Sequence, residues 1–97
     1  MECHVRYRVI RREAFEAFCN GKTINMSGSG VLLITDRVLP PGLLVEVEID
    51  WPVKLAESVP LKMVVKGKVV RSVKEDVALA GVKILRYAFR TAGVADP

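Results

Sequence analysis

The sequence is short of cysteine and histidine, and this shortage excludes two common ways of stabilising a small domain. It contains two cysteines, Cys3 and Cys19, and a single histidine, His4. Two cysteines cannot form a disulfide-dense scaffold. Together with one histidine they fall short of the four ligands, in paired spacings, of a structural zinc site. We therefore predict two reduced thiols, no metal site and no resident cofactor.

Long apolar runs and a secretion-type leader are also missing. No apolar run approaches the ~18–20 residues that a membrane-spanning helix needs, and Met1–Arg6 lacks an apolar stretch behind a basic start. The chain has 97 residues, of which 51% are hydrophobic and 27% charged, a composition too apolar for intrinsic disorder. These features predict one folded domain over residues 1–97, in the cytoplasm and without a membrane span.

Catalytic groupings and stacking aromatics are scarce. No nucleophile is paired with a general base, and no set of carboxylates is spaced for acid–base chemistry, so we do not expect an enzyme. The net charge of +4 is compatible with anionic partners. However, the six aromatic residues are scattered and do not form the interleaved platforms that single-stranded nucleic acids require. Nucleic-acid binding by a small basic barrel is therefore not favoured.

Alternation of apolar and polar residues is the strongest structural signal in the sequence. In Val5–Val9 three apolar residues alternate with two arginines, the pattern of a strand with one buried face. The same reasoning predicts further strands at Lys22–Asn25, Val31–Thr35, Leu43–Ile49, Leu61–Val73 and Val77–Leu85. Six short strands with hardly any helix predict an all-β fold, an antiparallel barrel or sandwich. Its inward-facing residues should include Val31, Leu33, Val45, Val47, Val69, Val82 and Ile84.

Glycine, proline and asparagine mark the expected connections between these strands. Turns are expected at Asn20-Gly21 and Pro40–Gly42, and a tight loop at Ser27–Gly30. Trp51-Pro52 is expected to end a strand, and Gly67 to introduce a bulge or bend.

Two segments have no clear assignment from their pattern. The apolar residues of Arg11–Cys19 fit helical spacing and also fit strand alternation. The segment Arg86–Ala92 fits a short terminal helix, with Tyr87 and Phe89 able to dock on the body of the domain.

The segment Asn25–Gly30 fits the pattern D/N-x-S-x-x-G and is followed at once by the apolar strand Val31–Ile34. Three further landmarks follow in order, at Leu39–Gly42, Gly67–Arg71 and Gly81–Ile84. Together they resemble the PilZ domain, a bacterial receptor module for cyclic di-GMP. The resemblance covers roughly Val5 to Phe89 and implies a six-stranded antiparallel β-barrel with a short C-terminal helix at most.

The chemistry of this hexapeptide suits a nucleotide. Asn25 offers an amide donor and acceptor, Ser27 offers a hydroxyl, and the glycines let backbone N–H groups approach a ligand closely. The same side chains can instead bond their own turn, and both roles are compatible. The resemblance implies that Asn25 and Ser27 contact a guanine and that Gly30 keeps the loop tight.

Arginines are concentrated near the amino terminus, where Arg6, Arg8, Arg11 and Arg12 lie within seven positions. Guanidinium groups bind phosphates and guanine edges, although such a row can also be the solvated face of a strand. In the PilZ family, an RxxxR segment before the first barrel strand holds the ligand. The resemblance therefore implies ligand contacts by Arg8 and Arg12, which match RxxxR, with Arg6 beside them.

A second alignment of this motif stays open. Val5–Val9 has the alternation expected of the first barrel strand, and residues 13–24 leave little room for two strands and a turn before Asn25. On this alignment the arginine segment would lie before Met1, and the match at Arg8 and Arg12 would be coincidental.

Two functions follow from the resemblance. The first is a regulatory domain that binds cyclic di-GMP as a second-messenger receptor and passes the signal to an unidentified protein partner. Its expected ligand-binding residues are Asn25, Ser27, Gly30, Arg8, Arg12 and Arg6. The second is a degenerate PilZ-like adaptor that works through protein contacts and binds cyclic di-GMP weakly or not at all.

Overall fold

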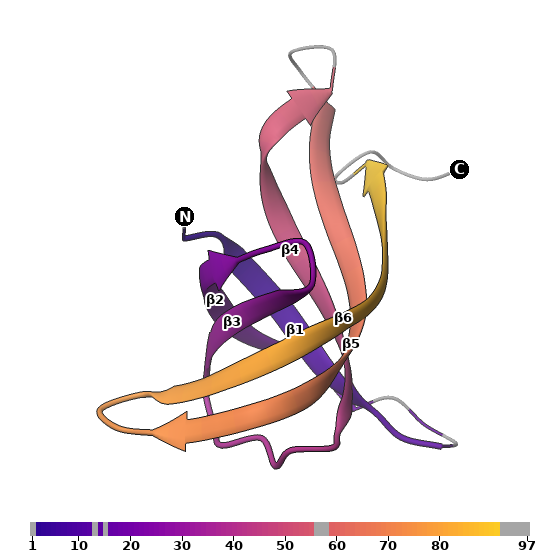
Figure 1. Ribbon diagram of the computed structural model, residues 1–97. Coiled ribbons are helices and arrows are strands. Elements are labelled where there is room, and N and C mark those ends of the chain that lie inside the picture. Colours follow the sequence, from indigo (N-terminus) through magenta and orange to yellow (C-terminus); the bar gives the residue numbers. More distant parts are fainter. Residues whose placement is uncertain (1, 13, 15, 56–58, 92–97) are drawn as a thin grey trace.

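A computed structural model describes residues 2–12, 14, 16–55 and 59–91, and these form an antiparallel barrel of six strands (Figure 1). The strands are β1 (His4–Ile10), β2 (Cys19–Met26), β3 (Gly30–Thr35), β4 (Leu44–Leu55), β5 (Val59–Lys74) and β6 (Ala78–Thr91). Their order around the wall is β1-β2-β3-β6-β5-β4, and pairing of β1 with β4 closes the barrel. The all-β antiparallel barrel predicted from the sequence is confirmed.

The barrel interior is filled by the apolar residues that alternate along the strands. Six of the seven predicted inward residues are buried, and the seventh, Ile84, is half-buried against the same core. The fully enclosed members include Val5, Val9 and Leu33, which are at most 1% exposed. Each such side chain stabilises the fold by about 1.5–3 kcal/mol relative to an exposed one.

The turn predicted at Asn20-Gly21 is wrong, because both residues lie inside β2. A Cβ at Gly21 would come within 2.5 Å of the carbonyl oxygen of Ile34 on β3. Glycine is therefore required here for close approach of two strands rather than for a turn.

The strand end predicted at Trp51-Pro52 is also wrong, because β4 continues to Leu55. Pairing of β1 with β4 is recorded only as far as Ile49, so Pro52 follows the point where that edge loses its neighbour. A proline is tolerated at such an edge, since its missing N–H has no ladder partner to lose.

The other predicted connections, together with the bulge predicted at Gly67, are confirmed. Residues 27–29 form the connection between β2 and β3, and Gly42 takes a left-handed φ of 99° in the turn after the two prolines. The β5–β6 register shifts between Lys66 and Gly67, as expected for a bulge. A Cβ at Gly67 would lie 2.5 Å from the carbonyl oxygen of Lys83, so the bulge brings two backbones together.

The two unassigned segments also have a structure. Residues 11, 12, 14 and 16–18 form the irregular connection between β1 and β2, while residues 13 and 15 lie outside the described residues. The short helix allowed over Arg86–Ala92 is absent as far as Thr91, because Arg86–Thr91 continues β6 and pairs with β5. Ala92 lies outside the described residues.

The last part of the sheet extends beyond the barrel. Figure 1 shows β4, β5 and the end of β6 rising past β1, β2 and β3. Trp51 of β4 packs edge-to-face on Phe89 of β6, with ring centroids 5.1 Å apart. We call this extension the arm; it comprises residues 50–55, 59–66 and 84–91.

Candidate ligand-binding site

A β-bulge decides where Asn25 points. Thr23 pairs with Leu33 and Asn25 pairs with Leu32, so Ile24 is an extra residue in β2. Thr23 is 1% exposed and faces the core, whereas Asn25 is exposed on the outer side. Without the extra residue, positions 23 and 25 would share a face, because side chains alternate with a period of two. The bulge therefore presents the Asn25 amide to solvent.

Hydrogen bonds hold the loop that follows Asn25. The Ser27 N–H donates to the Gly30 carbonyl at 2.9 Å, and the Ile84 N–H of β6 donates to the Ser29 carbonyl at 2.9 Å. The Ser29 N–H reaches the Ser27 hydroxyl at the longer distance of 3.4 Å. Ser27 thus takes part in its own turn. Its exposed hydroxyl has recorded contacts of 3.4 and 3.5 Å with described residues, and a ligand can replace such long contacts.

The two glycines of the motif have different surroundings. A Cβ at Gly30 would lie 3.2 Å from the carbonyl oxygen of Val82 on β6, a tight contact. A Cβ at Gly28 would meet nothing within 4 Å. Gly30 therefore lets the loop lie close to β6, whereas Gly28 has room for a side chain.

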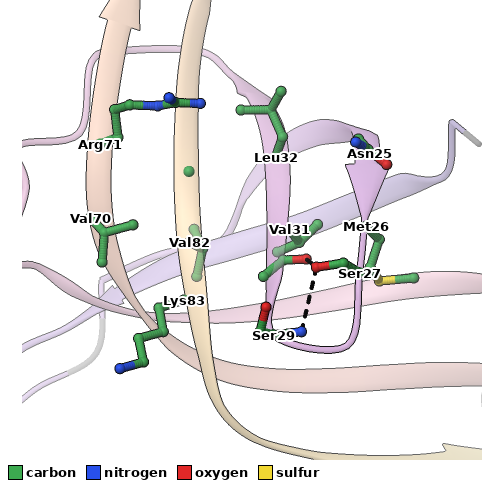
Figure 2. A pocket seen from close by; sticks show the side chains of 12 residues that line it. Asn25, Met26, Ser27, Ser29, Val31, Leu32, Val70, Arg71, Val82 and Lys83 are labelled. Atoms are coloured by element: carbon green, nitrogen blue, oxygen red, sulfur yellow. Dashed lines mark hydrogen bonds between the residues drawn. The ribbon is translucent and has the colours of Figure 1, made fainter.

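A cavity of about 650 Å³ lies against this loop (Figure 2). Its volume is within the range of roughly 300–1,000 Å³ typical of small-molecule sites. The lining residues come from β2, β3, β5, β6 and the β2–β3 loop: Asn25, Met26, Ser27, Ser29, Gly30, Val31, Leu32, Val70, Arg71, Gly81, Val82 and Lys83. The site thus combines the three residues of the hexapeptide that the sequence singled out.

Two cations on the opposite side of this cavity were not predicted as site residues. Arg71 on β5 extends across β6 toward Leu32, as Figure 2 shows, and Lys83 follows Val82 on β6. Both are exposed, and neither has an ion pair recorded with any residue in the described ranges. The sequence contained a signal for both residues, since Arg71 belongs to the landmark Gly67–Arg71 and Lys83 to the landmark Gly81–Ile84. Arg71 pairs with Gly81 across β5 and β6, so Arg71 and Lys83 both line the cavity.

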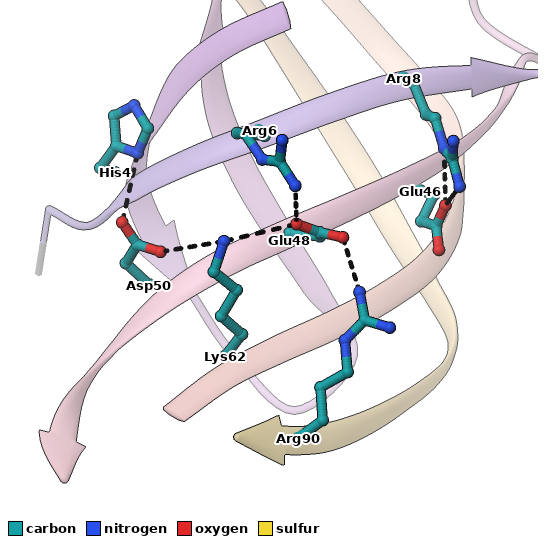
Figure 3. A network of polar contacts seen from close by, with 8 residues as sticks. All are labelled: His4, Arg6, Arg8, Glu46, Glu48, Asp50, Lys62 and Arg90. Atoms are coloured by element: carbon teal, nitrogen blue, oxygen red, sulfur yellow. Dashed lines mark hydrogen bonds and ion pairs between the residues drawn. The ribbon is translucent and has the colours of Figure 1, made fainter. Parts of the chain in front are cut away.

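Arg6 and Arg8 of β1 are engaged elsewhere, on the outer face of β4 (Figure 3). Arg6 pairs with Glu48 and Arg8 pairs with Glu46, each at 2.6 Å. The ring of Phe18 lies against both guanidinium groups, at 4.3 Å from Arg6 and 4.4 Å from Arg8. These arginines cover two carboxylates that are themselves buried.

The structure does not bring these arginines to the hexapeptide. Arg6 pairs with Asn20, which lies five residues before Asn25 on β2 and thus roughly 16 Å away at ~3.3 Å per residue. Arg8 lies further along β1 in the same direction, and exposed Arg12 lies beyond the end of β1. The prediction that Val5–Val9 lies in the first strand of the barrel is confirmed.

The buried carboxylate of Glu48 is the centre of the charged network in Figure 3. It accepts hydrogen bonds from Arg6 at 2.6 Å and from Arg90 at 2.7 Å. It also forms an ion pair with Lys62 at 3.5 Å. Burial raises the pKa of Glu48, but the hydrogen bond from Arg6 and the charges of all three cations outweigh it. The pKa is therefore below its ordinary value of 4.5. This network joins β1, β4, β5 and the end of β6.

No group of three or more potential metal ligands occurs among the residues that the structure describes. Cys3 is buried, Cys19 is half-buried, and both are free thiols. In the described ranges we find no helix with the length and apolarity to cross a membrane.

Searches of curated proteins and of solved structures gave no match. The family model for the PilZ domain matches residues 2–91, nearly the whole chain, in agreement with the six-stranded barrel. PilZ domains are binding and regulatory modules of the cyclic di-GMP receptor family. The chain belongs to the PilZ domain family.

Proposed function

We propose that this chain is a cyclic di-GMP receptor module whose site is the cavity beside the β2–β3 loop. The observation that carries the proposal is the joint placement of Asn25, Ser27 and Gly30 on one side of this cavity and of two cations on the other. The ligand has two guanines and two negatively charged phosphates, so it requires both kinds of contact.

Each group in the cavity has a role that its chemistry allows. The Asn25 amide donates and accepts hydrogen bonds, and the Ser27 hydroxyl does the same, which suits the edge of a guanine. Arg71 offers a planar fork of N–H groups for a phosphate, and Lys83 adds a second positive charge. Gly81 between them adds no side chain to the cavity lining.

The proposed activity is a switch and involves no chemical conversion. A ligand shifts a protein between states only through contacts that differ between those states. The loop is held to β6 through Ser29 and Ile84, so a ligand bound at the loop can alter how the start of the arm is presented to a partner.

The test is an NMR titration of the whole chain with cyclic di-GMP, which detects affinities down to the millimolar range. We expect the backbone amides of Asn25–Gly30 and Gly81–Lys83 to shift on titration. In Asn25→Ala and Ser27→Ala the affinity obtained from these shifts should fall by tenfold or more, because each variant loses hydrogen bonds to the base.

Gly28→Ala is the matched control, because its new methyl group meets nothing within 4 Å. It should titrate like the parent chain. Shifts that are absent throughout, or that persist unchanged in both Asn25→Ala and Ser27→Ala, would leave the adaptor function as the better explanation of the fold.

A further inference from the structure

In the described part of the chain, the end of β6 has a neighbouring strand on one edge and none recorded on the other. In β6, Ala78–Lys83 pairs with β3, and the Ile84 N–H still reaches the Ser29 carbonyl. From Arg86 to Thr91 the strand pairs with β5 alone among the described residues. A strand edge of this length presents unpaired N–H and C=O groups, to which another extended segment can add.

The face of the arm that continues the barrel interior is apolar and partly uncovered. Tyr87 is 58% and Phe89 is 46% exposed, although their partners Val65 and Met63 on β5 are buried. A second cavity of about 380 Å³ lies here between the β2–β3 loop and the arm, which contributes Trp51, Met63, Ile84, Tyr87 and Phe89. Side chains at alternate positions of an added strand would enter this cavity.

The opposite face of the arm is basic near its base, and the acid opposite Lys66 on β4, Glu46, is already paired with Arg8. Lys66 and Arg86 are direct cross-strand partners, and neither has a recorded ion pair within the described part of the chain. Further along, Arg90 and Lys62 are already paired with Glu48. Like charges directly opposite one another destabilise a sheet. An acidic side chain placed beside Arg86 would relieve this repulsion.

We propose that the free edge of β6 from Arg86 to Thr91 binds an extended peptide segment of a protein partner in which acidic and apolar residues alternate. The backbone of the segment would pair with β6 as an added strand. Its acidic side chains would lie beside Arg86, and its apolar side chains would pack against Tyr87 and Phe89. This inference does not depend on cyclic di-GMP binding.

A second copy of the chain fits this edge less well. Two-fold pairing of two β6 edges would bring the Arg86 and Arg90 side chains of both copies to the same face of the sheet. The added positive charges would increase the repulsion already present between Lys66 and Arg86. Charge complementarity therefore favours an acidic partner over self-association.

The test uses a fluorescein-labelled peptide of alternating glutamate and valine, EVEVEVE, and its reverse-charge counterpart KVKVKVK. Fluorescence anisotropy should show saturable binding of EVEVEVE to the whole chain, with at least tenfold weaker binding of KVKVKVK. Emission of Trp51, the only tryptophan, should shift to shorter wavelength as the peptide covers the cavity.

Three variants locate the binding. Arg86→Glu and Phe89→Ser should each weaken binding of EVEVEVE by about tenfold, since one reverses a contacting charge and the other removes an apolar contact. Lys74→Glu changes the charge equally at the other end of β5 and should alter binding less than twofold.

Three results would overturn the proposal: no binding of EVEVEVE, equal binding of both peptides, or equal sensitivity of binding to Arg86→Glu and Lys74→Glu. If Phe89→Ser fails to fold, Arg86→Glu still decides the matter, because Arg86 is exposed. Concentration-dependent dimerisation of the chain without peptide, abolished by Arg86→Glu, would show that a second copy occupies the edge instead.

Discussion

Thr23 and Asn25 lie two residues apart in β2, yet their side chains point to opposite faces of the barrel wall. The Thr23 hydroxyl accepts a hydrogen bond from the buried N–H of Cys3 at 2.8 Å, while Asn25 faces the outer cavity. The one-residue shift at Ile24 allows both placements. A single bulge thus fastens the start of β1 and presents the residue proposed to contact guanine.

Deletion of Ile24 should therefore damage both stability and ligand binding. A regular ladder would place Thr23 and Asn25 on one face, so either the Cys3 N–H loses its partner or the Asn25 amide becomes buried. A buried polar group without a partner costs about 1–3 kcal/mol. Urea unfolding measures the loss, and Ile24→Val is the control, with an expected loss below ~1 kcal/mol. A deletion variant with parental stability and parental cyclic di-GMP shifts would show that the bulge has no such role.

Gly67→Ala should destabilise the barrel by about 1–3 kcal/mol, because the added methyl group overpacks the bulge. The methyl carbon would lie 2.5 Å from both the Lys83 carbonyl oxygen and a Val82 side-chain carbon. Thermal unfolding monitored by circular dichroism checks this expectation. Gly28→Ala, which adds the same methyl group in open space, should leave the midpoint nearly unchanged. Equal midpoints for the two variants would contradict the argument from close approach.

Glu48 should make the fold acid-sensitive. Its folded-state pKa lies below the ordinary 4.5, so ionised Glu48 contributes stability above that pH and loses it as the pH falls through the folded-state value. Glu48→Gln should cost about 1–3 kcal/mol at pH 7, less than a fully buried pair, because Arg6 and Arg90 are half-exposed. The variant should also lose less stability on acidification.

Glu16→Gln is the control for this experiment, because Glu16 also accepts hydrogen bonds from two arginines, Arg11 and Arg37, but its side chain is 29% exposed. Urea unfolding at several pH values should show a smaller effect of Glu16→Gln than of Glu48→Gln at pH 7. An identical pH dependence for Glu48→Gln and the parent chain would refute the assignment of acid sensitivity to Glu48.

The proposed site should bind cyclic di-GMP weakly by itself and more tightly when an RxxxR segment is added. Arg71→Ala should weaken cyclic di-GMP binding about tenfold to a hundredfold, since a hydrogen bond to a charged group contributes about 1.5–3 kcal/mol. Arg12→Ala should leave binding unchanged, because Arg12 lies beyond the end of β1 that is farther from Asn25.

Fusing an RxxxR segment before Glu2 should raise the affinity by two to four orders of magnitude, the equivalent of roughly 3–6 kcal/mol from two arginines. Cys3 bonds to Thr23 through both its N–H and its carbonyl, so residues added upstream enter beside Asn25. Calorimetry of the fused and parent chains measures the gain. Micromolar binding by the parent chain that is lost in both Arg8→Ala and Arg12→Ala would instead identify the local RxxxR match as the working pair.

Local patterns in the sequence were sufficient for the strands and for the hexapeptide. Period-two alternation identified the buried face of β3 and of the first half of β4, because a barrel wall has one apolar side and one polar side. The turn at Gly42 was predictable for a similar local reason, since a left-handed φ favours glycine. Asn25, Ser27 and Gly30 were found because they are close together along the chain.

Relationships between distant segments were decided by the tertiary structure. Gly21 resembles a turn residue in the sequence, and the tertiary structure shows that it lies against the Ile34 backbone of β3. Arg8 matches the RxxxR motif in the sequence, and the tertiary structure shows that it pairs with Glu46 of β4. Arg71 reaches the cavity of Asn25 only because β5 and β3 both pair with β6. The apolar pattern of a strand fixes which face is buried, but the cross-strand partner of each residue is set only when the strands pack together in the barrel.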